Sequence, residues 1–113
     1  GAETFYPDGT AFNTAGSDIL AVLCKEYDIP YYVLTPMLKV DNRALYGKFK
    51  KEIIRDEKET LAKNWPTELA EKVDFKVIEL VPIRPDKITK YVTEHGIVSP
   101  CDLNYYLCKE GVE

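Results

Sequence analysis

The stretch AGSDILAVLCKEYDIPYYVL, residues 15–34, decides the fold class of this chain. The small residues 15–18 open a helix, and the apolar residues that follow at 19–24 give that helix a broad apolar face. Ile29-Pro30 ends the helix, and residues 31–34 form a short apolar strand of the kind that is buried on both faces of a parallel sheet. A helix that leads so directly into such a strand is half of a βαβ unit, so the stretch predicts an α/β fold.

The next region, residues 42–72, differs in character because it contains long runs of Lys and Glu with few turn residues. Apolar residues recur in it at helical spacing: Leu45, Phe49, Ile53 and Ile54. This spacing predicts an amphipathic surface helix over residues 43–62. Because the charges are mixed in sign, they indicate a solvated helical face rather than a binding patch. We therefore predict a charged helical insertion at 42–72.

The remainder of the chain supplies further elements. Residues 75–81 predict a second strand. Asp86 is placed to cap a helix that ends at His95-Gly96, and the inner stripe of this helix is Ile88, Tyr91 and Val92. His95, at the last turn of that helix, suits the helix dipole and is interpreted as structural. Residues 103–108 form either a last helical turn or a strand.

Size and composition indicate one soluble globular domain. The chain has 113 residues, of which 45% are hydrophobic and 30% charged. No apolar run approaches the roughly 20 residues that a membrane-spanning helix needs, so no membrane partner is expected. The net charge is −4, and Lys and Arg are spread among acidic residues. This pattern disfavours direct nucleic-acid binding, which needs a basic face.

The cysteines indicate a reducing compartment. Cys24, Cys101 and Cys108 are odd in number and lack C-x-x-C spacing, which argues against a disulfide framework and against a zinc site. We therefore expect a cytoplasmic protein with no metal and no cofactor. Cys24 lies on the apolar helix face and is interpreted as a buried, inert thiol.

Residues 13–18 also suggest a binding site. A small, glycine-containing loop that enters a helix presents unpaired backbone N–H groups and the positive end of the helix dipole, which together suit a phosphate or a carboxylate. An ordinary capped helix starts with the same residue types, so the pattern alone leaves both interpretations open.

The opening segment resembles a known family. Gly1-Ala2-Glu3, Asp8-Gly9 and Asn13-x-x-Gly16-Ser17 are similar, without insertion or deletion, to the pattern Gly-Ala-Asp, Asn-Gly and Asn-Lys-x-Gly-Thr. That pattern belongs to the family uniting the alpha, beta and delta subunits of translation initiation factor two-B with methylthioribose-1-phosphate and ribose-1,5-bisphosphate isomerases. Residues 29–36 and 83–100 resemble later family motifs in matching order.

This resemblance implies a Rossmann-like fold with a mostly parallel sheet flanked by helices. It implies that residues 1–113 are the C-terminal portion of a single Rossmann-like domain, a fragment of a longer protein. Residues 42–72 find no clear counterpart in the family pattern.

The resemblance also implies roles for individual residues. Glu3 falls at the position of the family's catalytic Asp, with one extra methylene, and a misplacement near 1 Å can cost roughly 100-fold in rate. Asn13, Thr14, Gly16 and Ser17 fall at the substrate- and phosphate-binding positions, where Thr14 replaces a lysine. The family's catalytic Cys belongs to a part of the fold outside this chain.

Two functions follow from these substitutions. The favoured one is a translation initiation factor two-B-like regulatory subunit, which acts as a homodimer or with related subunits and binds a sugar phosphate or nucleotide. Residues 36–40 support it, since they resemble the beta-subunit continuation. The alternative is an aldose–ketose isomerase of a salvage pathway. An interaction module without a small-molecule site is a third hypothesis.

Overall fold

The computed structural model describes residues 1–43, 47 and 53–109. Its strands are β1 (Thr4–Phe5), β2 (Ala11–Thr14), β3 (Tyr32–Leu34), β4 (Ile53–Asp56), β5 (Lys76–Ile83), β6 (Lys90–Thr93) and β7 (Gly96–Val98). Its helices are α1 (Ser17–Glu26), α2 (Lys58–Leu61), α3 (Thr67–Ala70) and α4 (Leu103–Lys109). Short 3-10 turns form η1 (Met37–Lys39), η3 (Pro85–Lys87) and η4 (Pro100–Asp102). The α/β class is confirmed.

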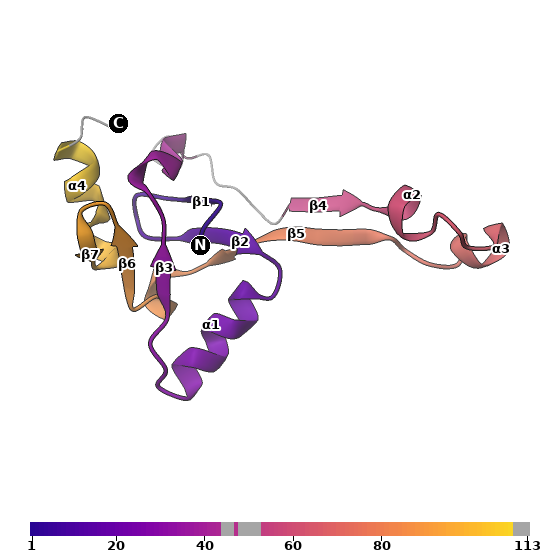
Figure 1. Cartoon of the computed structure of the whole chain (residues 1–113), viewed down its shortest axis with the longest axis horizontal. Coiled ribbons are helices and arrows are strands. Elements are labelled where there is room, and N and C mark those ends of the chain that lie inside the picture. Colours follow the sequence, from indigo (N-terminus) through magenta and orange to yellow (C-terminus); the bar gives the residue numbers. More distant parts are fainter. Residues whose placement is uncertain (44–46, 48–52, 110–113) are drawn as a thin grey trace.

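One sheet has the strand order β1-β2-β5-β4, and all of its pairs are antiparallel (Figure 1). A tight turn joins β1 to β2, where the Tyr6 N–H donates to the Thr10 carbonyl at 2.8 Å and Gly9 has a φ of 97°. A Cβ at Gly9 would lie 2.7 Å from the Cβ of Pro100. The backbone conformation and the available space both require glycine at this turn.

A second sheet has the order β3-β6-β7, in which β3 and β6 are parallel and β6 and β7 antiparallel. The prediction of a mostly parallel sheet is therefore wrong for the described residues. Short turns join β1 to β2 and β6 to β7, and a short turn can only connect antiparallel strands. Strands β3 and β6 are separated by the long connection that contains the β4–β5 arm, which is the kind of separation that parallel pairing requires.

The hydrophobic core joins the two sheets. Its buried residues are Ala2, Phe5, Ala11, Ala21, Val33, Met37, Ile83, Ile88, Tyr91, Val98, Leu103 and Leu107. Tyr91 is fully buried, and its ring lies 5.7 Å from that of Phe5. The Tyr91 hydroxyl donates to the Gly9 carbonyl at 2.6 Å. This bond connects the β1–β2 turn to the second sheet.

Strands β4 and β5 form an arm that extends from the body and carries α2 and α3 at its tip (Figure 1). Part of the predicted helix over 43–62 falls at residues 44–46 and 48–52, outside the described residues. Residues 53–56 are strand rather than helix, because they pair with β5, and such pairing outweighs weak helical spacing in β-branched residues such as Ile53. That residues 42–72 are an insertion stays a prediction.

The predicted helix that begins at Asp86 is also wrong. Asp86 lies inside η3, after which the chain forms the β6–β7 hairpin. Gly96 does adopt the predicted left-handed conformation, with a φ of 90°, but as the first residue of β7, directly after the hairpin turn. His95 stacks on Tyr106 at 5.2 Å between ring centroids, so its contact is structural. Tyr91 is the buried residue of β6, and Ile88, just before the strand, is buried as well, so the strand buries apolar residues that suggested a helix.

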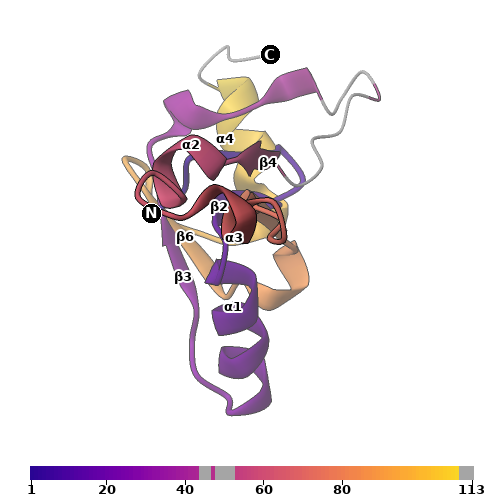
Figure 2. The same cartoon turned by 90° about the vertical axis from the view of Figure 1, so that its right-hand side faces the viewer.

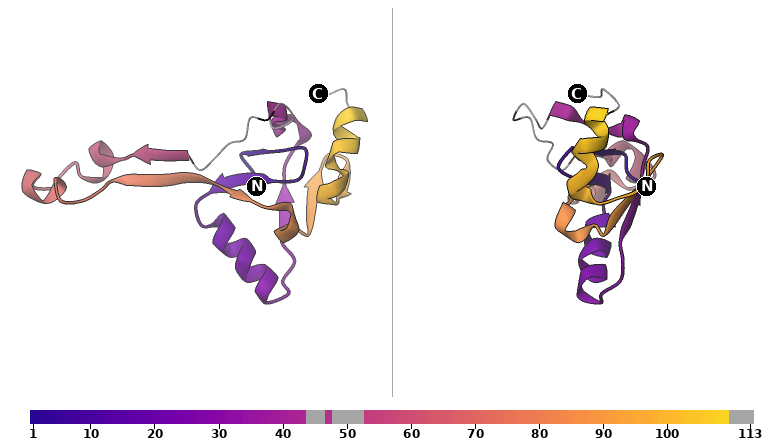
Figure 3. Two further views of the ribbon diagram at one scale, coloured as in Figure 1. Left: turned by 180° about the vertical axis from the view of Figure 1, so that it is seen from behind. Right: turned by 90° about the vertical axis from the view of Figure 1, so that its left-hand side faces the viewer.

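Helix α1 and strand β3 form where the sequence predicts them. The prediction that this strand is buried on both faces is wrong, because Val33 is buried but Tyr32 and Leu34 are exposed. Figures 2 and 3 show α1 projecting from the body on the side away from the C-terminus. Ala21 is its buried residue, whereas its large apolar side chains are exposed: Ile19, Leu20, Val22 and Leu23. Within the described residues, no helix combines the length and apolar character needed to cross a membrane.

Candidate functional site

The β1–β2 hairpin positions Glu3 next to β2. The Glu3 N–H donates to the Phe12 carbonyl at 2.9 Å, so Glu3 lies beside the segment that leads to Asn13. Phe5 and Phe12 are both buried and anchor the two strands in the interior. The Glu3 side chain itself is exposed. A core-anchored backbone therefore presents this carboxylate to solvent.

Strand β2 carries the other predicted residues toward α1. Asn13 is paired with Val81 of β5 and is half-buried, whereas Thr14 is paired with Leu80 and exposed. The Ala15 N–H donates to the Glu79 carbonyl at 3.2 Å, which extends this pairing up to the turn before the helix. Glu3 and Asn13 are thus brought together across the hairpin, and Gly16 and Ser17 follow at the start of α1.

The start of α1 has the open backbone that an anion requires. Gly16 is the N-cap with a φ of 102°, and no side chain caps the helix. Open space surrounds Gly16, since a Cβ there would have no neighbour within 4 Å. However, the Gly16 N–H donates to Oδ1 of Asp18 at 3.3 Å. This carboxylate stands near the helix N-terminus and opposes the binding of a second negative charge.

Tyr31 supports the same turn from the strand side. Its hydroxyl donates to the Ser17 carbonyl at 3.0 Å. Burial raises the pKa of Tyr31, and the charges of Cys24 and Asp18 raise it further. The phenol therefore remains a hydrogen-bond donor at neutral pH, which holds the first turn of α1 against the body.

Sequence reasoning did not identify two further residues, Lys39 and Glu94. The Lys39 Nζ donates to the Ala2 carbonyl at 2.9 Å, and the Lys39 carbonyl accepts from Oγ1 of Thr4 at 2.8 Å. The Glu94 carboxylate accepts the Met37 N–H, with its two oxygens at 2.9 and 3.3 Å, and so fixes the η1 turn that carries Lys39. These contacts lie far apart in sequence, so no local pattern could have revealed them.

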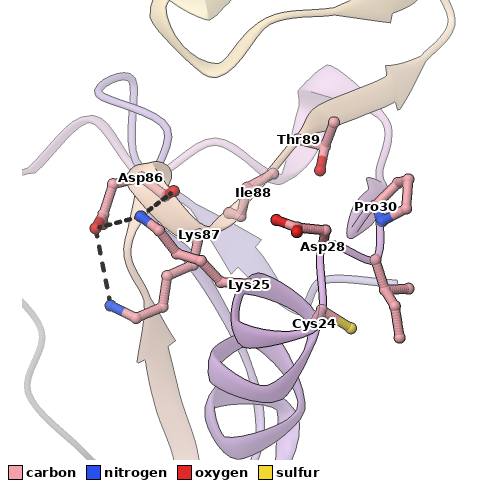
Figure 4. Close-up of a pocket in the computed structure, with 9 residues that line it drawn as sticks. Cys24, Lys25, Asp28, Pro30, Asp86, Lys87, Ile88 and Thr89 are labelled. Atoms are coloured by element: carbon pink, nitrogen blue, oxygen red, sulfur yellow. Dashed lines mark hydrogen bonds and ion pairs between the residues drawn. The ribbon is translucent and has the colours of Figure 1, made fainter.

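A separate cavity of about 320 Å³ lies at the other end of α1 (Figure 4). Lys25 donates to the Asp86 carbonyl at 3.2 Å, and its Nζ lies 3.6 Å from Oδ2 of Asp86. Partial desolvation acts to raise the pKa of Asp86, but the charges of Lys87, Lys25 and Arg84 together lower it. None of the predicted site residues lines this cavity, so it is distinct from the hairpin site.

The three cysteines carry free thiols. Cys24 is half-buried rather than buried, while Cys101 and Cys108 are exposed. Across the part of the chain that the structure describes, no group of three or more His, Cys, Asp or Glu residues is placed to hold a metal ion.

Comparison with known proteins gives curated relatives that are named as isomerases. The putative methylthioribose-1-phosphate isomerase of Methanocaldococcus jannaschii is 36% identical over 103 residues, which cover 88% of this chain and 30% of that protein. The methylthioribose-1-phosphate isomerase of Aquifex aeolicus is 33% identical over 103 residues, covering 88% of this chain and 22% of that protein. The chain thus spans about a third or less of the length of these relatives.

Solved structures share the fold. The 5-methylthioribose 1-phosphate isomerase of Pyrococcus horikoshii matches with a TM-score of 0.71 at 22% identity, covering 97% of this chain and 31% of that one. The translation initiation factor eIF-2B of the same organism matches with a TM-score of 0.63 at 24% identity, covering 88% of this chain and 32% of that one. At these identities the likeness is one of fold.

The profile of the Initiation factor 2 subunit family matches residues 1–100. This match includes the whole β1–β2 hairpin, α1, both sheets and the arm, and the first motifs of the resemblance stand within it. The chain therefore belongs to the Initiation factor 2 subunit family.

Proposed function

We propose that these residues supply part of the substrate site of an aldose–ketose isomerase that acts on a sugar phosphate. The observation that carries this proposal is the arrangement of the hairpin. The backbone of Glu3, whose side chain is exposed, bonds to the Phe12 carbonyl of β2, and β2 continues through Asn13 to the open N-terminus of α1. The names of the curated relatives, at 33% and 36% identity, support the isomerase function over a regulatory one.

The proposed chemistry assigns each residue a role. Conversion of an aldose phosphate to a ketose phosphate moves a proton between adjacent carbons, which needs a positioned acid–base group. Glu3 is that group. Asn13 and Thr14 offer side-chain hydrogen bonds, and the backbone N–H groups that follow Gly16 at the start of α1 receive the phosphate. The cysteine that the resemblance implies as partner of Glu3 falls outside residues 1–113, so the proposal concerns the contribution of this chain to a longer protein.

The test is an activity assay of the full-length protein. Incubation with 5-methylthioribose 1-phosphate, followed by NMR, should show a ketose phosphate, and Glu3→Gln should abolish its formation. Glu59→Gln is the matched control, because Glu59 is an exposed carboxylate of α2 on the distant arm. Absence of turnover with both 5-methylthioribose 1-phosphate and ribose 1,5-bisphosphate would contradict the proposal.

A second candidate function is that of a regulatory subunit of the initiation factor two-B type, which works through association. Asp18 favours it, since its carboxylate stands where a phosphate would bind. The exposed apolar side chains of α1 favour it as well, because apolar surface of this kind is typical of an interface. The full-length protein should then form a dimer, or assemble with related subunits, and lack turnover. A monomer at high concentration in analytical ultracentrifugation would count against this function.

A further inference from the structure

We infer that the ammonium group of Lys39 is the cation of this site and that it holds the negative charge of the sugar phosphate next to Glu3. The inference rests on the proposed function, because it names a further contact for the same substrate. It concerns a residue that neither the sequence motifs nor the relatives' names assign to the site.

Lys39 forms hydrogen bonds with both sequence neighbours of Glu3, Ala2 and Thr4. Its Nζ donates at 2.9 Å to the carbonyl of Ala2, which belongs to the peptide bond that joins Ala2 to Glu3. Its own carbonyl accepts the hydroxyl of Thr4, the residue after Glu3, at 2.8 Å. The cation is therefore fixed to the backbone of the segment that presents the carboxylate.

The η1 turn is itself held rigidly, so the start of the Lys39 side chain is well defined. Met37 is buried in the core, and its N–H donates to both oxygens of Glu94. The Val40 N–H then closes the turn by donating to the Met37 carbonyl at 3.1 Å. An anion that binds a cation already held in place loses less conformational entropy than one that must first order a mobile segment.

Lys39 also retains capacity for an anion. An ammonium group has three N–H donors, and the bond to Ala2 uses one of them. Among the described residues, no carboxylate lies within ion-pair distance of Lys39. By contrast, Lys25 and Lys87 both face Asp86. The charge of Lys39 is thus not neutralised by a neighbouring acid and is available to a ligand.

This cation meets a requirement of the proposed substrate. A sugar phosphate carries negative charge, and Glu3 and Asp18 both add negative charge near it. Thr14, at the position of the family's lysine, carries no positive charge. Lys39 instead reaches the same segment through its bond to the Ala2 carbonyl, and its positive charge offsets that repulsion.

The test uses four variants of the full-length protein with 5-methylthioribose 1-phosphate as substrate and inorganic phosphate as competitor. Lys39→Gln keeps a donor for the Ala2 carbonyl but removes the charge, Lys39→Met removes both, and Lys39→Arg restores the charge. Lys63→Met, on the arm, is the matched control. We expect the Gln and Met variants to raise KM and the phosphate inhibition constant about 10-fold or more. Lys39→Arg should recover most of the loss, and Lys63→Met should change neither value.

Salt and stability separate a charge effect from a structural one. The difference between wild type and Lys39→Gln should shrink as ionic strength rises, because an exposed charge is screened. If Lys39→Gln has the same KM and phosphate inhibition constant as the wild type, the inference is overturned while the isomerase function stands. If the wild type turns over neither sugar phosphate, the proposed function fails. Calorimetric binding of inorganic phosphate then decides the inference: binding weakened by Lys39→Gln supports it, and unchanged binding overturns it.

Discussion

Replacing Tyr91 with Phe tests the bond that connects the site-bearing hairpin to the second sheet. The substitution keeps the ring contact with Phe5 but removes the hydroxyl that donates to the Gly9 carbonyl at 2.6 Å. Because Tyr91 is fully buried, water cannot replace that donor without disturbing the core. Leaving a buried acceptor unpaired costs about 1–3 kcal/mol of the free energy of unfolding. For a domain of this size, that corresponds to a fall in Tm of roughly 5–15 °C.

The assay is urea unfolding followed by circular dichroism, with Tyr27→Phe as the matched control because Tyr27 is 71% exposed. The control should unfold like the wild type. The m-value of Tyr91→Phe should also match the wild type, so that the shift in midpoint reports stability alone. A free energy of unfolding within about 0.5 kcal/mol of the wild type would refute the role of this bond.

Four further predictions concern stability, pH and ligand binding. Burial raises the pKa of Tyr91, so its contribution to stability is full below the ordinary tyrosine pKa of about 10 and is lost as the pH rises above it. The fall in the urea midpoint between about pH 8 and pH 10.5 should therefore be smaller in Tyr91→Phe than in wild type, and an equal fall would contradict this reasoning. Gly9→Ala should cost about 2–5 kcal/mol in the same unfolding assay, against about 1–2 for Gly16→Ala, because both have positive φ but only Gly9 meets a neighbouring proline. Glu94→Ala should cost about 1 kcal/mol, because the Met37 N–H loses its acceptor, and equal stability would contradict that contact. Asp18→Asn should tighten binding of inorganic phosphate in calorimetry by about two- to fivefold, because a like charge leaves the helix N-terminus.

The elements that the sequence predicts correctly are those specified by local signals. Gly16 opens α1, and the apolar run that follows ends in β3, so both elements could be placed from neighbouring residues. Strand β5 could be recognised from its β-branched residues, although it runs through Pro82 to Ile83. Pro82 is tolerated there as a partner of Phe12 in the antiparallel pair.

The elements that the sequence misses depend on partners elsewhere in the chain. Ile53 and Ile54 have helical spacing, yet they become strand because β5 offers them a pairing edge. Strand β6 carries residues with high strand propensity, and its pairing with β3 overrides the helix-capping signal of Asp86. The relative direction of the strands was least accessible to local reasoning. The resemblance implied a mostly parallel sheet, whereas the four-stranded sheet is antiparallel.

The residues of the candidate site fall into the same two groups, those with a local sequence signal and those brought in by the fold. Glu3, Asn13 and Gly16 could be located because their spacing along one continuous segment carries the resemblance. The contact of Lys39 with Ala2 spans 37 residues, and that of Glu94 with Met37 spans 57. Such contacts depend on the folded arrangement of β3, η1 and β6, and no spacing rule predicts them.

The most direct test of the central claim is an amide NMR titration of the full-length protein with 5-methylthioribose 1-phosphate. If the hairpin and the start of α1 form the sugar-phosphate site, saturable shifts should concentrate at Glu3, at residues 13–17 and at Lys39. Shifts confined to the cavity between Cys24 and Thr89 in Figure 4, or none at all, would contradict it.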